Sequence, residues 1–320
     1  GSADLFVTEA CEYTNSFLSF YPTMGIILNI EADHLDFFKD IEDIRQSFRR
    51  FAKLLPEDGV LIINSDIRDY REITEGIAAR VVTVGSDPEA SDYSAANIRF
   101  NEEACAAYEL LVHGKPVQTI TVGTPGMHNV YNSLAAAAAA HELGITGAEI
   151  ETGLLRFHGT HRRFEKKGEI GGVTVIDDYA HHPTEIAALL DAARRRYPDS
   201  TIRVIFQPHL FSRTKFFAHQ FAKSLAKADD VIITGIFPAR ETQTDFPDTS
   251  PSTIVDAAAG LKDASAGTWI QPVEDMCLAA KMMAMRAHHG DVIFTVGAGD
   301  ITDMDQVLLT ALEAHRESCE

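Results

Sequence analysis

The sequence predicts two α/β domains in one chain. Its 320 residues, 45% of them hydrophobic, are enough for more than one core. Strand-like and helical patterns alternate along the chain, and the alternation becomes regular after residue 170. The stretch before it, residues 156–170, is polar, basic and interrupted by glycines. We therefore place a domain boundary near Glu165, which gives domains over 1–165 and 166–320.

The first domain is predicted to begin with a strand–helix–strand rhythm. Short β-branched, apolar runs predict strands over 5–10 and 24–30. Residues 41–55 carry apolar side chains at helical spacing, and 59–65 return to a strand.

The rest of the first domain is predicted to be a strand-rich region followed by helices. Residues 106–112 and 116–122 flank His113-Gly114-Lys115, a pattern typical of a β-hairpin. The alanine run predicts a helix over 128–143, and a second helix is expected over 148–155.

The second domain is predicted to be a doubly wound parallel sheet, because strands and helices alternate singly. Strands are expected at 173–177, 202–206, 230–234, 268–271 and 291–296. Helices are expected at 184–197, 215–226, 252–260, 275–287 and 303–316.

Composition excludes several functional classes. A formal net charge of -19 argues against a nucleic-acid partner. No apolar run approaches the roughly 20 residues that span a membrane, and the first residues lack the pattern of a signal peptide. The dispersed Cys11, Cys105, Cys277 and Cys319 form no C-x-x-C pair, which favours a reducing cytoplasm. Gly1-Ser2 is typical of a cloning remnant, so we expect a fragment of a longer protein.

Polar residues collect where predicted strands end, as they do at the functional edge of α/β sheets. The four runs are Glu9 with Glu12, NIEADHLD (29–36), DDYAHH (177–182) and QPHLFSR (207–213). In NIEADHLD, carboxylates and His34 could bind a divalent cation. Alternatively, Asp33 caps a helix whose dipole favours Asp36.

Three further groups of residues allow more than one interpretation. His128, Asn129 and Asn132 at a helix start could bind a heterocycle or an anion, or Asn129 could be a simple cap. Arg162-Arg163 suits phosphate, or forms a solvated hinge. Asp178 with His181 and His182 could act in acid–base chemistry, bind a metal or orient a substrate.

Two nucleotide-binding motifs are not matched. In VGAGDIT (296–302), Thr302 occupies the third glycine position of a dinucleotide fingerprint. A G-x-x-x-x-G-K-[ST] phosphate loop does not occur in the sequence.

Taken together, the motifs of this chain resemble the Mur ligases over essentially its whole length. They occur in family order: EACEY, NIEADHLD, GMHNVYNSLAAAAAA, HRRFE, DDYAHHPTE, FQPHLFSRT and GAGDI. The resemblance is closest to the members that add L-alanine to UDP-N-acetylmuramate in peptidoglycan synthesis. It implies the remainder of a central ATP-binding domain over 1–165 and a Rossmann-like C-terminal ligase domain over 166–320.

The resemblance also implies a reaction and roles for individual residues. ATP and Mg²⁺ convert the carboxylate of the UDP-sugar to an acyl phosphate, which the amine of L-alanine attacks. Glu9 and His34 correspond to Mg²⁺ ligands, His128, Asn129 and Asn132 to the adenine side, Arg163 to ATP phosphates and Asp178 to the ribose. His181, His209 and Arg213 correspond to residues facing the acyl phosphate and the amino acid.

Two departures from the family pattern limit this expectation. Leu210 stands where some relatives carry arginine, so Arg213 is the better candidate for carboxylate recognition. The phosphate loop and the UDP-sugar domain lie outside this sequence, so we expect the chain alone not to catalyse the full reaction. Alternatives are a murein tripeptide ligase of the same family, a non-catalytic pair of nucleotide- or partner-binding domains, or a metal-dependent hydrolase built on Asp33, His34, His181 and His182.

Overall fold

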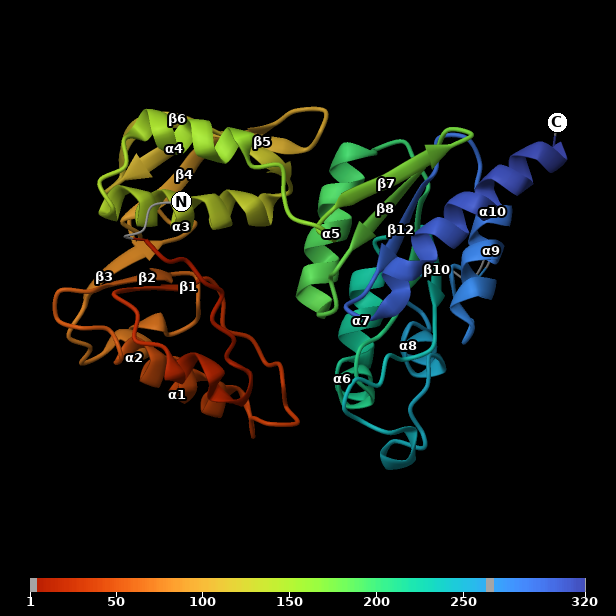
Figure 1. The fold of residues 1–320 in the computed structure, drawn as a ribbon, viewed down its shortest axis with the longest axis horizontal. Helices are drawn as coiled ribbons and strands as arrows, with labels where there is room; N and C mark the ends of the chain where they lie inside the picture. The colour runs from red at the N-terminus through yellow and green to blue at the C-terminus, as the bar shows by residue number, and fades with distance from the viewer. Residues whose placement is uncertain (1–4, 263–267, 320) are drawn as a thin grey trace. The chain divides into compact units, whose positions relative to one another are not determined.

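The computed structural model describes residues 5–262 and 268–319, and these form two compact units (Figure 1). Along the chain the first unit ends at Arg156 and the second runs from Phe157, with 100–105 and 123–127 also grouped with the second. The boundary predicted near Glu165 falls at the first strand of the second unit. Gly1-Ser2 lie outside the described residues.

The first unit is built on a six-stranded sheet whose strands follow chain order. β1 pairs with β2, and β2 with β3, in parallel. β5 and β6 are neighbours joined by His113 and Gly114, whose φ angles of 49° and 70° suit a two-residue hairpin turn, so the predicted hairpin is confirmed. The strands are β1 (Met24–Ile27), β2 (Val60–Asn64), β3 (Arg80–Val84), β4 (Tyr93–Phe100), β5 (Cys105–Val112) and β6 (Lys115–Pro125).

Helices cover both faces of this sheet (Figure 1). On one face, Phe51 of α1 packs with Phe17, Leu61 and Ile63 in an apolar core. On the other, the predicted alanine-rich helix α3 buries Leu134 and its neighbours. The helices are η1 (Tyr13–Ser19), α1 (Ile41–Ala52), α2 (Tyr70–Thr74), α3 (Met127–Glu142) and α4 (Gly147–Arg156).

The strand predicted over residues 5–10 is wrong. These residues belong to no helix or strand, and Leu5, Phe6 and Val7 are exposed. A strand needs a hydrogen-bonded neighbour, and within the described ranges the free edge of β1 has no pairing with residues 5–10. An apolar, β-branched pattern alone is therefore insufficient here.

The second unit confirms the doubly wound α/β prediction. Its sheet has the order β11-β10-β9-β12-β8-β7, and all adjacent pairs are parallel except β7 with β8. The strands are β7 (Glu165–Ile170), β8 (Val173–Asp178), β9 (Ile202–Phe206), β10 (Asp230–Ile233), β11 (Ile270–Pro272) and β12 (Val292–Val296). Because β9, β12 and β8 are parallel neighbours, the residues that follow them meet at one edge of the sheet.

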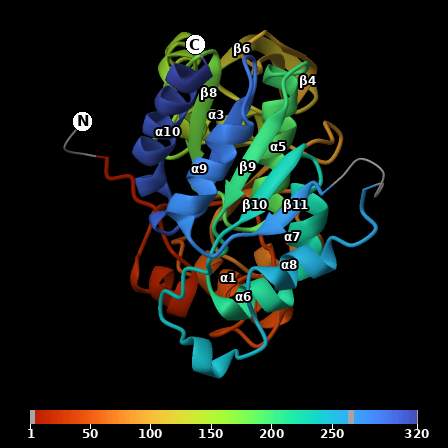
Figure 2. The same ribbon diagram turned by 90° about the vertical axis from the view of Figure 1, so that its right-hand side faces the viewer.

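Helices α5 and α7 cover one face of this sheet, and α9 and α10 cover the other (Figures 1 and 2). Strands buried on both faces favour apolar residues, and β9 and β12 are buried throughout, with Arg203 and Thr295 as their polar members. The helices are α5 (Pro183–Arg196), α6 (Phe211–Phe216), α7 (Ala218–Leu225), η2 (Gln243–Asp245), α8 (Ser252–Ala257), α9 (Met276–Arg286), η4 (Asp300–Asp303) and α10 (Met304–Cys319).

Two local predictions for this unit need correction. β7 forms inside the stretch expected to be a linker, because its polar sequence suits an exposed edge strand. The single helix expected over 215–226 is divided at Phe217, whose φ of -104° and ψ of 17° are not helical and whose ring packs against His182 and Phe221. In the described part of the chain no helix is both long and apolar enough to cross a membrane.

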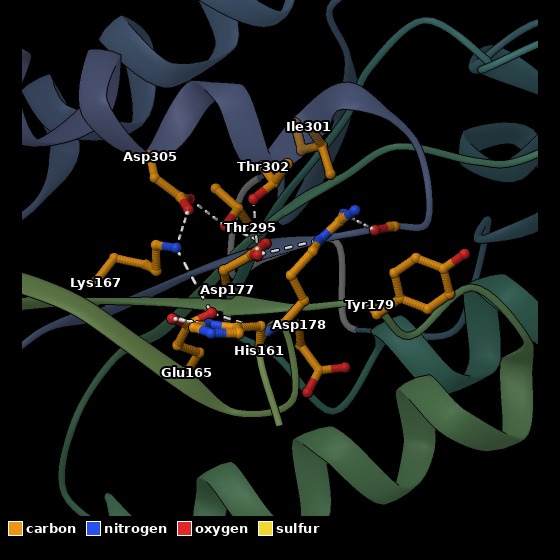
Figure 3. A network of polar contacts seen from close by, with 12 residues as sticks. His161, Glu165, Lys167, Asp177, Asp178, Tyr179, Thr295, Ile301, Thr302 and Asp305 are labelled. Atoms are coloured by element: carbon orange, nitrogen blue, oxygen red, sulfur yellow. Dashed lines mark hydrogen bonds and ion pairs between the residues drawn. The ribbon is translucent and has the colours of Figure 1, made fainter. Parts of the chain in front are cut away.

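A buried carboxylate joins α10 to the sheet. Asp305, in the first turn of α10, is 4% exposed, accepts a hydrogen bond from Thr295 Oγ1 at 2.7 Å and lies 3.6 Å from Lys167 Nζ (Figure 3). Burial raises the pKa of Asp305 to about 6; Asp177 adds to the rise, while Thr295 and Lys167 oppose it. Because its folded pKa exceeds the ordinary value of 3.8, Asp305 makes folding less favourable, fully so above about pH 6, and this cost shrinks as pH falls from 6 towards 3.8.

We predict that Asp305→Asn raises the free energy of unfolding above pH 6 by about 1–3 kcal/mol, because the amide mimics the protonated acid. The difference from wild type should shrink by about pH 4.5, where the native carboxyl is itself protonated. Urea unfolding at both pH values checks this, with the exposed Asp303→Asn as the matched control. Lower stability at both pH values would show that the ion pair with Lys167 dominates.

Candidate functional site

In the second unit, four residues singled out in the sequence lie along one series of contacts through Glu185 at the carboxyl edge of the sheet, and Asp178 binds backbone N–H groups of the linker and the following turn. Arg163 and Asp178 come from the linker and the end of β8, His181 precedes α5, and His209 and Arg213 follow β9.

Glu185 connects the linker to the turn after β8. Its carboxylate lies 3.6 Å from the Arg163 guanidinium and 3.3 Å from Nδ1 of His181. It also accepts from the backbone N–H groups of His181 and His182, which closes a capping box at the start of α5. Burial alone would raise the pKa of Glu185, but the His181 and Arg163 charges and these N–H donors together lower it. Glu185 therefore stays ionised beside Arg163.

His181 is oriented by acceptors on one side of its ring. Nδ1 lies 3.1 Å from the carbonyl of Tyr179 and 3.3 Å from Glu185, and both of these groups accept hydrogen bonds. A proton on Nδ1 satisfies them and leaves Nε2 as the acceptor of the neutral ring. The ring stands edge-on to His209, with centroids 5.9 Å apart. His181 is thus suited to receive or relay a proton at Nε2.

His209 and Arg213 form the next link. Nη1 of the buried Arg213 lies 3.2 Å from Nδ1 of His209, and because arginine can only donate, Nδ1 is the acceptor. The ring of His209 stacks on that of Phe237, with centroids 5.5 Å apart. Leu210, between them, is buried with φ of 69° and donates its N–H to the carbonyl of Phe237. Its side chain therefore faces the protein interior, not the site.

Asp178 is more buried than a binding carboxylate needs to be. Its two oxygens accept the N–H groups of Phe164 and Ala180, each at 2.8 Å. Burial raises the pKa of Asp178 to about 6, although these N–H donors and the charge of Arg163 oppose the rise. Asp178 thus fixes the linker to β8, and its remaining lone pairs are the part that a ligand hydroxyl could use.

In the first unit, His34 lies with Glu12, not with Glu9. His34 Nε2 is 3.4 Å from Glu12, and this hydrogen bond lowers the pKa of Glu12 against the opposing effect of burial. Glu9 is exposed, in the segment that forms no strand. The role of Glu9 as a metal ligand stays a prediction.

The surroundings of His34 can be compared with what a cation requires. The backbone of His34 is in the left-handed region, with φ of 51°. The buried Nδ1 atom of its ring has no hydrogen-bond partner among the described residues. Within the same ranges, no three His, Cys, Asp or Glu side chains gather as a metal site. One imidazole and one carboxylate fit a cation such as Mg²⁺, which keeps waters and takes phosphate oxygens as further ligands.

His128, Asn129 and Asn132 lie in the first turns of α3, as predicted. Nδ2 of Asn132 donates to Oδ1 of Asn129 at 3.1 Å, which places both amides on one face of the helix. His128 and Asn132 are exposed. This surface can present amide donors and acceptors to a flat ring, and whether it does so stays a prediction.

Sequence reasoning missed two residues of these groups, Glu185 and Phe237, and did not pair Glu12 with His34. Glu185 was available from the spacing of His182 and Glu185, since a capping acid three residues after the cap is a known signature. Glu12 was visible in EACEY, but only the tertiary turn shows that it reaches His34. Phe237 lies in a loop with no motif, and no sequence signal indicated its contact with His209.

Comparisons with known proteins agree with this architecture. Residues 1–140 match the Mur ligase middle domain, and residues 162–299 match the Mur ligase glutamate ligase domain. A protein of Bifidobacterium longum strain DJO10A, named UDP-N-acetylmuramate--L-alanine ligase, is 60% identical over 339 residues, covering 100% of this chain and 66% of the relative. The chain therefore spans about two thirds of the length of that relative.

Two solved structures share the fold. The UDP-N-acetylmuramate-alanine ligase of Thermotoga maritima is 26% identical with a TM-score of 0.72, covering 96% of this chain and 62% of that one. A murein peptide ligase of Psychrobacter arcticus 273-4 is 25% identical with a TM-score of 0.66, covering 93% and 59%. These matches, with both domain models, show that the chain belongs to the Mur ligase family.

Proposed function

We propose that this chain carries the nucleotide- and amino-acid-handling part of an ATP-dependent ligase that adds L-alanine to UDP-N-acetylmuramate. The observation that carries the proposal is the 60% identity, over the whole chain, to a protein with that name. The contact series from Arg163 through Glu185 and His181 to His209 and Arg213 supports it, because it joins anion-binding groups to proton-accepting ones.

The proposed reaction forms an acyl phosphate and then an amide. Phosphoryl transfer depends on positioning and charge neutralisation, which the half-exposed Arg163 can supply to a phosphate. Amide formation needs the amine of L-alanine in its neutral form, and Nε2 of His181 would take its proton. Arg213 would bind the carboxylate of the amino acid by a charge-assisted hydrogen bond.

The cofactors of the proposed reaction are ATP and Mg²⁺. His34 and Glu12 would hold the cation, which supplies charge neutralisation for the transferring phosphoryl group. His128, Asn129 and Asn132 would meet the adenine, and Asp178 a ribose hydroxyl. Free thiols at Cys11, Cys105 and Cys277 are consistent with a proposed cytoplasmic location.

The test joins this chain to the missing third of the Bifidobacterium longum relative and measures phosphate release with each candidate amine. L-alanine should support release from ATP and UDP-N-acetylmuramate, and a murein tripeptide should not. The reverse preference would assign the chain to the murein peptide ligases. Binding of ATP without release by any amine would leave the non-catalytic alternative.

In that joined protein, we predict that Arg163→Ala raises the KM for ATP about tenfold with a smaller effect on L-alanine, because one charge-assisted contact to phosphate is lost. Arg213→Ala should raise the KM for L-alanine more than the KM for ATP. Steady-state kinetics with each substrate varied in turn checks both, and Arg68→Ala, at a 94% exposed side chain, is the control. Equal effects of both variants on both substrates would contradict the division of roles.

For Asp178, we predict two losses in the same variant. Asp178→Ala leaves two N–H groups without their acceptor, so the free energy of unfolding should fall by about 2 kcal/mol. ATP affinity should fall as well, since the linker that carries Arg163 loosens. Urea unfolding and calorimetric titration with ATP·Mg²⁺ measure these effects. Unchanged stability would contradict the buried acceptor role seen in the structure.

A further inference from the structure

Arg162 and Arg163 are adjacent in sequence, but their surroundings differ. The side chain of Arg162 is 22% exposed, and that of Arg163 is 48% exposed. Arg162 is held by groups of the protein: Nε lies 3.3 Å from the Asp177 carboxylate, and Nη2 donates to the carbonyls of Gly297 at 2.6 Å and Gly299 at 3.2 Å. Only Arg163 presents half of its side chain to solvent.

The anchor of Arg162 is a fully buried carboxylate. Asp177, in β8, is 0% exposed and accepts from Thr302 Oγ1 at 2.9 Å, with Thr295 Oγ1 at 3.2 Å (Figure 3). Ionised carboxylates are buried only when they are paired and hydrogen-bonded. Because the charge of Arg162 is used in this pairing, binding a phosphate there would leave Asp177 uncompensated.

The linker backbone is held in an unusual conformation on both sides of Arg163. Arg162 and Phe164 have φ angles of 58° and 51°, a left-handed region that non-glycine residues adopt only when their surroundings impose it. The carbonyl of Arg162 accepts from Tyr179 N at 2.7 Å, and Phe164 N donates to Asp178 at 2.8 Å. Arg163 therefore projects from a short segment that is fastened at both ends.

Tyr179 completes the support. The guanidinium of Arg162 lies 4.9 Å from the centre of its ring and that of Arg163 lies 5.4 Å from it. Cation–π contact of this kind limits the directions in which Arg163 can point. The ring, the two clamped residues and Glu185 leave the Arg163 guanidinium little freedom of placement.

We propose that Arg162 is a positioning residue, which fixes the linker through Asp177 and the Gly297 and Gly299 carbonyls so that Arg163 meets a nucleotide phosphate. The inference rests on the proposed nucleotide role of Arg163. One arginine of the pair holds the backbone, and the other binds the ligand.

The test is a double-mutant cycle read by calorimetric titration of ATP·Mg²⁺ into the 320-residue chain. Arg163→Ala should weaken binding about tenfold, and Arg162→Ala should weaken it about five- to tenfold. Because Arg162 acts through Arg163, the double variant should bind no more than about twofold weaker than Arg163→Ala alone. If the double variant instead loses affinity by the product of the two single losses, the proposal is overturned, because Arg162 then contributes to ATP binding independently of Arg163.

Arg203→Ala is the matched control. Arg203 is also a buried arginine in the second unit, paired with Asp291 at 2.9 Å and Asp230 at 2.6 Å, but at the amino ends of the strands. The Arg203→Ala variant should be less stable than wild type but should bind ATP·Mg²⁺ with unchanged affinity. If it weakens ATP binding as much as Arg162→Ala does, the effect of Arg162 is general destabilisation and the proposal fails.

Hydrogen exchange gives a readout that does not depend on the nucleotide. Arg162→Ala should speed amide exchange in residues 159–166 and at Tyr179, and Arg203→Ala should not. Arg162→Lys should give an intermediate result, since one ammonium can face Asp177 but cannot reproduce the planar fork to both carbonyls. If the wild-type chain does not bind ATP·Mg²⁺, the proposed nucleotide role of Arg163 fails. Hydrogen exchange in the linker then tests the positioning role of Arg162 by itself, and unchanged exchange in Arg162→Ala overturns that role.

Discussion

The candidate site of the second unit depends on the buried ion pair between Asp177 and Arg162. A carboxylate at the end of a central strand, fully removed from water, needs a permanent cation and further donors. Arg162 and Thr302 donate to it, from the linker and from the turn before α10, and Thr295 of β12, whose hydroxyl proton goes to Asp305, lies 3.2 Å away. Three segments far apart in sequence are thereby fastened to the end of one strand.

Asp177 and Asp178 are consecutive but hold different segments, because side chains alternate between the two faces of a strand. Asp177 points toward Thr295, Thr302 and α10, whereas Asp178 points to the other side of β8, where it accepts from the linker N–H of Phe164 (Figure 3). The linker is therefore held on both faces of the strand end. This explains why neither acid is placed like a freely exposed catalytic group, although DDYAHH reads as one in the sequence. In the proposed function, Arg163, His181, His209 and Arg213 would meet the substrates, and Asp178 would offer a ribose hydroxyl only its remaining lone pairs.

The sequence was most informative where a repeating physical pattern was present. Alternating strands and helices predicted the second sheet, because its central strands β9 and β12 are mostly apolar and are buried along their whole length. Residues 5–10 carry a similar apolar run without a pairing strand, so the same reasoning failed there. Strand-end motifs also predicted a functional edge that includes the runs with His181, His209 and Arg213, and the resemblance to the Mur ligases implied a shared role for these three. They could not show that Glu185 links Arg163 to His181, or that Glu12 is the acid beside His34, because those contacts depend on how turns fold back.

The central claim is that Arg163, held by its neighbour, meets the phosphates of the nucleotide. A crystal structure of this chain with ADP and Mg²⁺ tests it most directly. The account predicts a phosphate oxygen about 3 Å from the Arg163 guanidinium, with the Arg162–Asp177 pair unchanged. A nucleotide bound away from the linker, or Arg162 turned from Asp177 onto the phosphate, would contradict it.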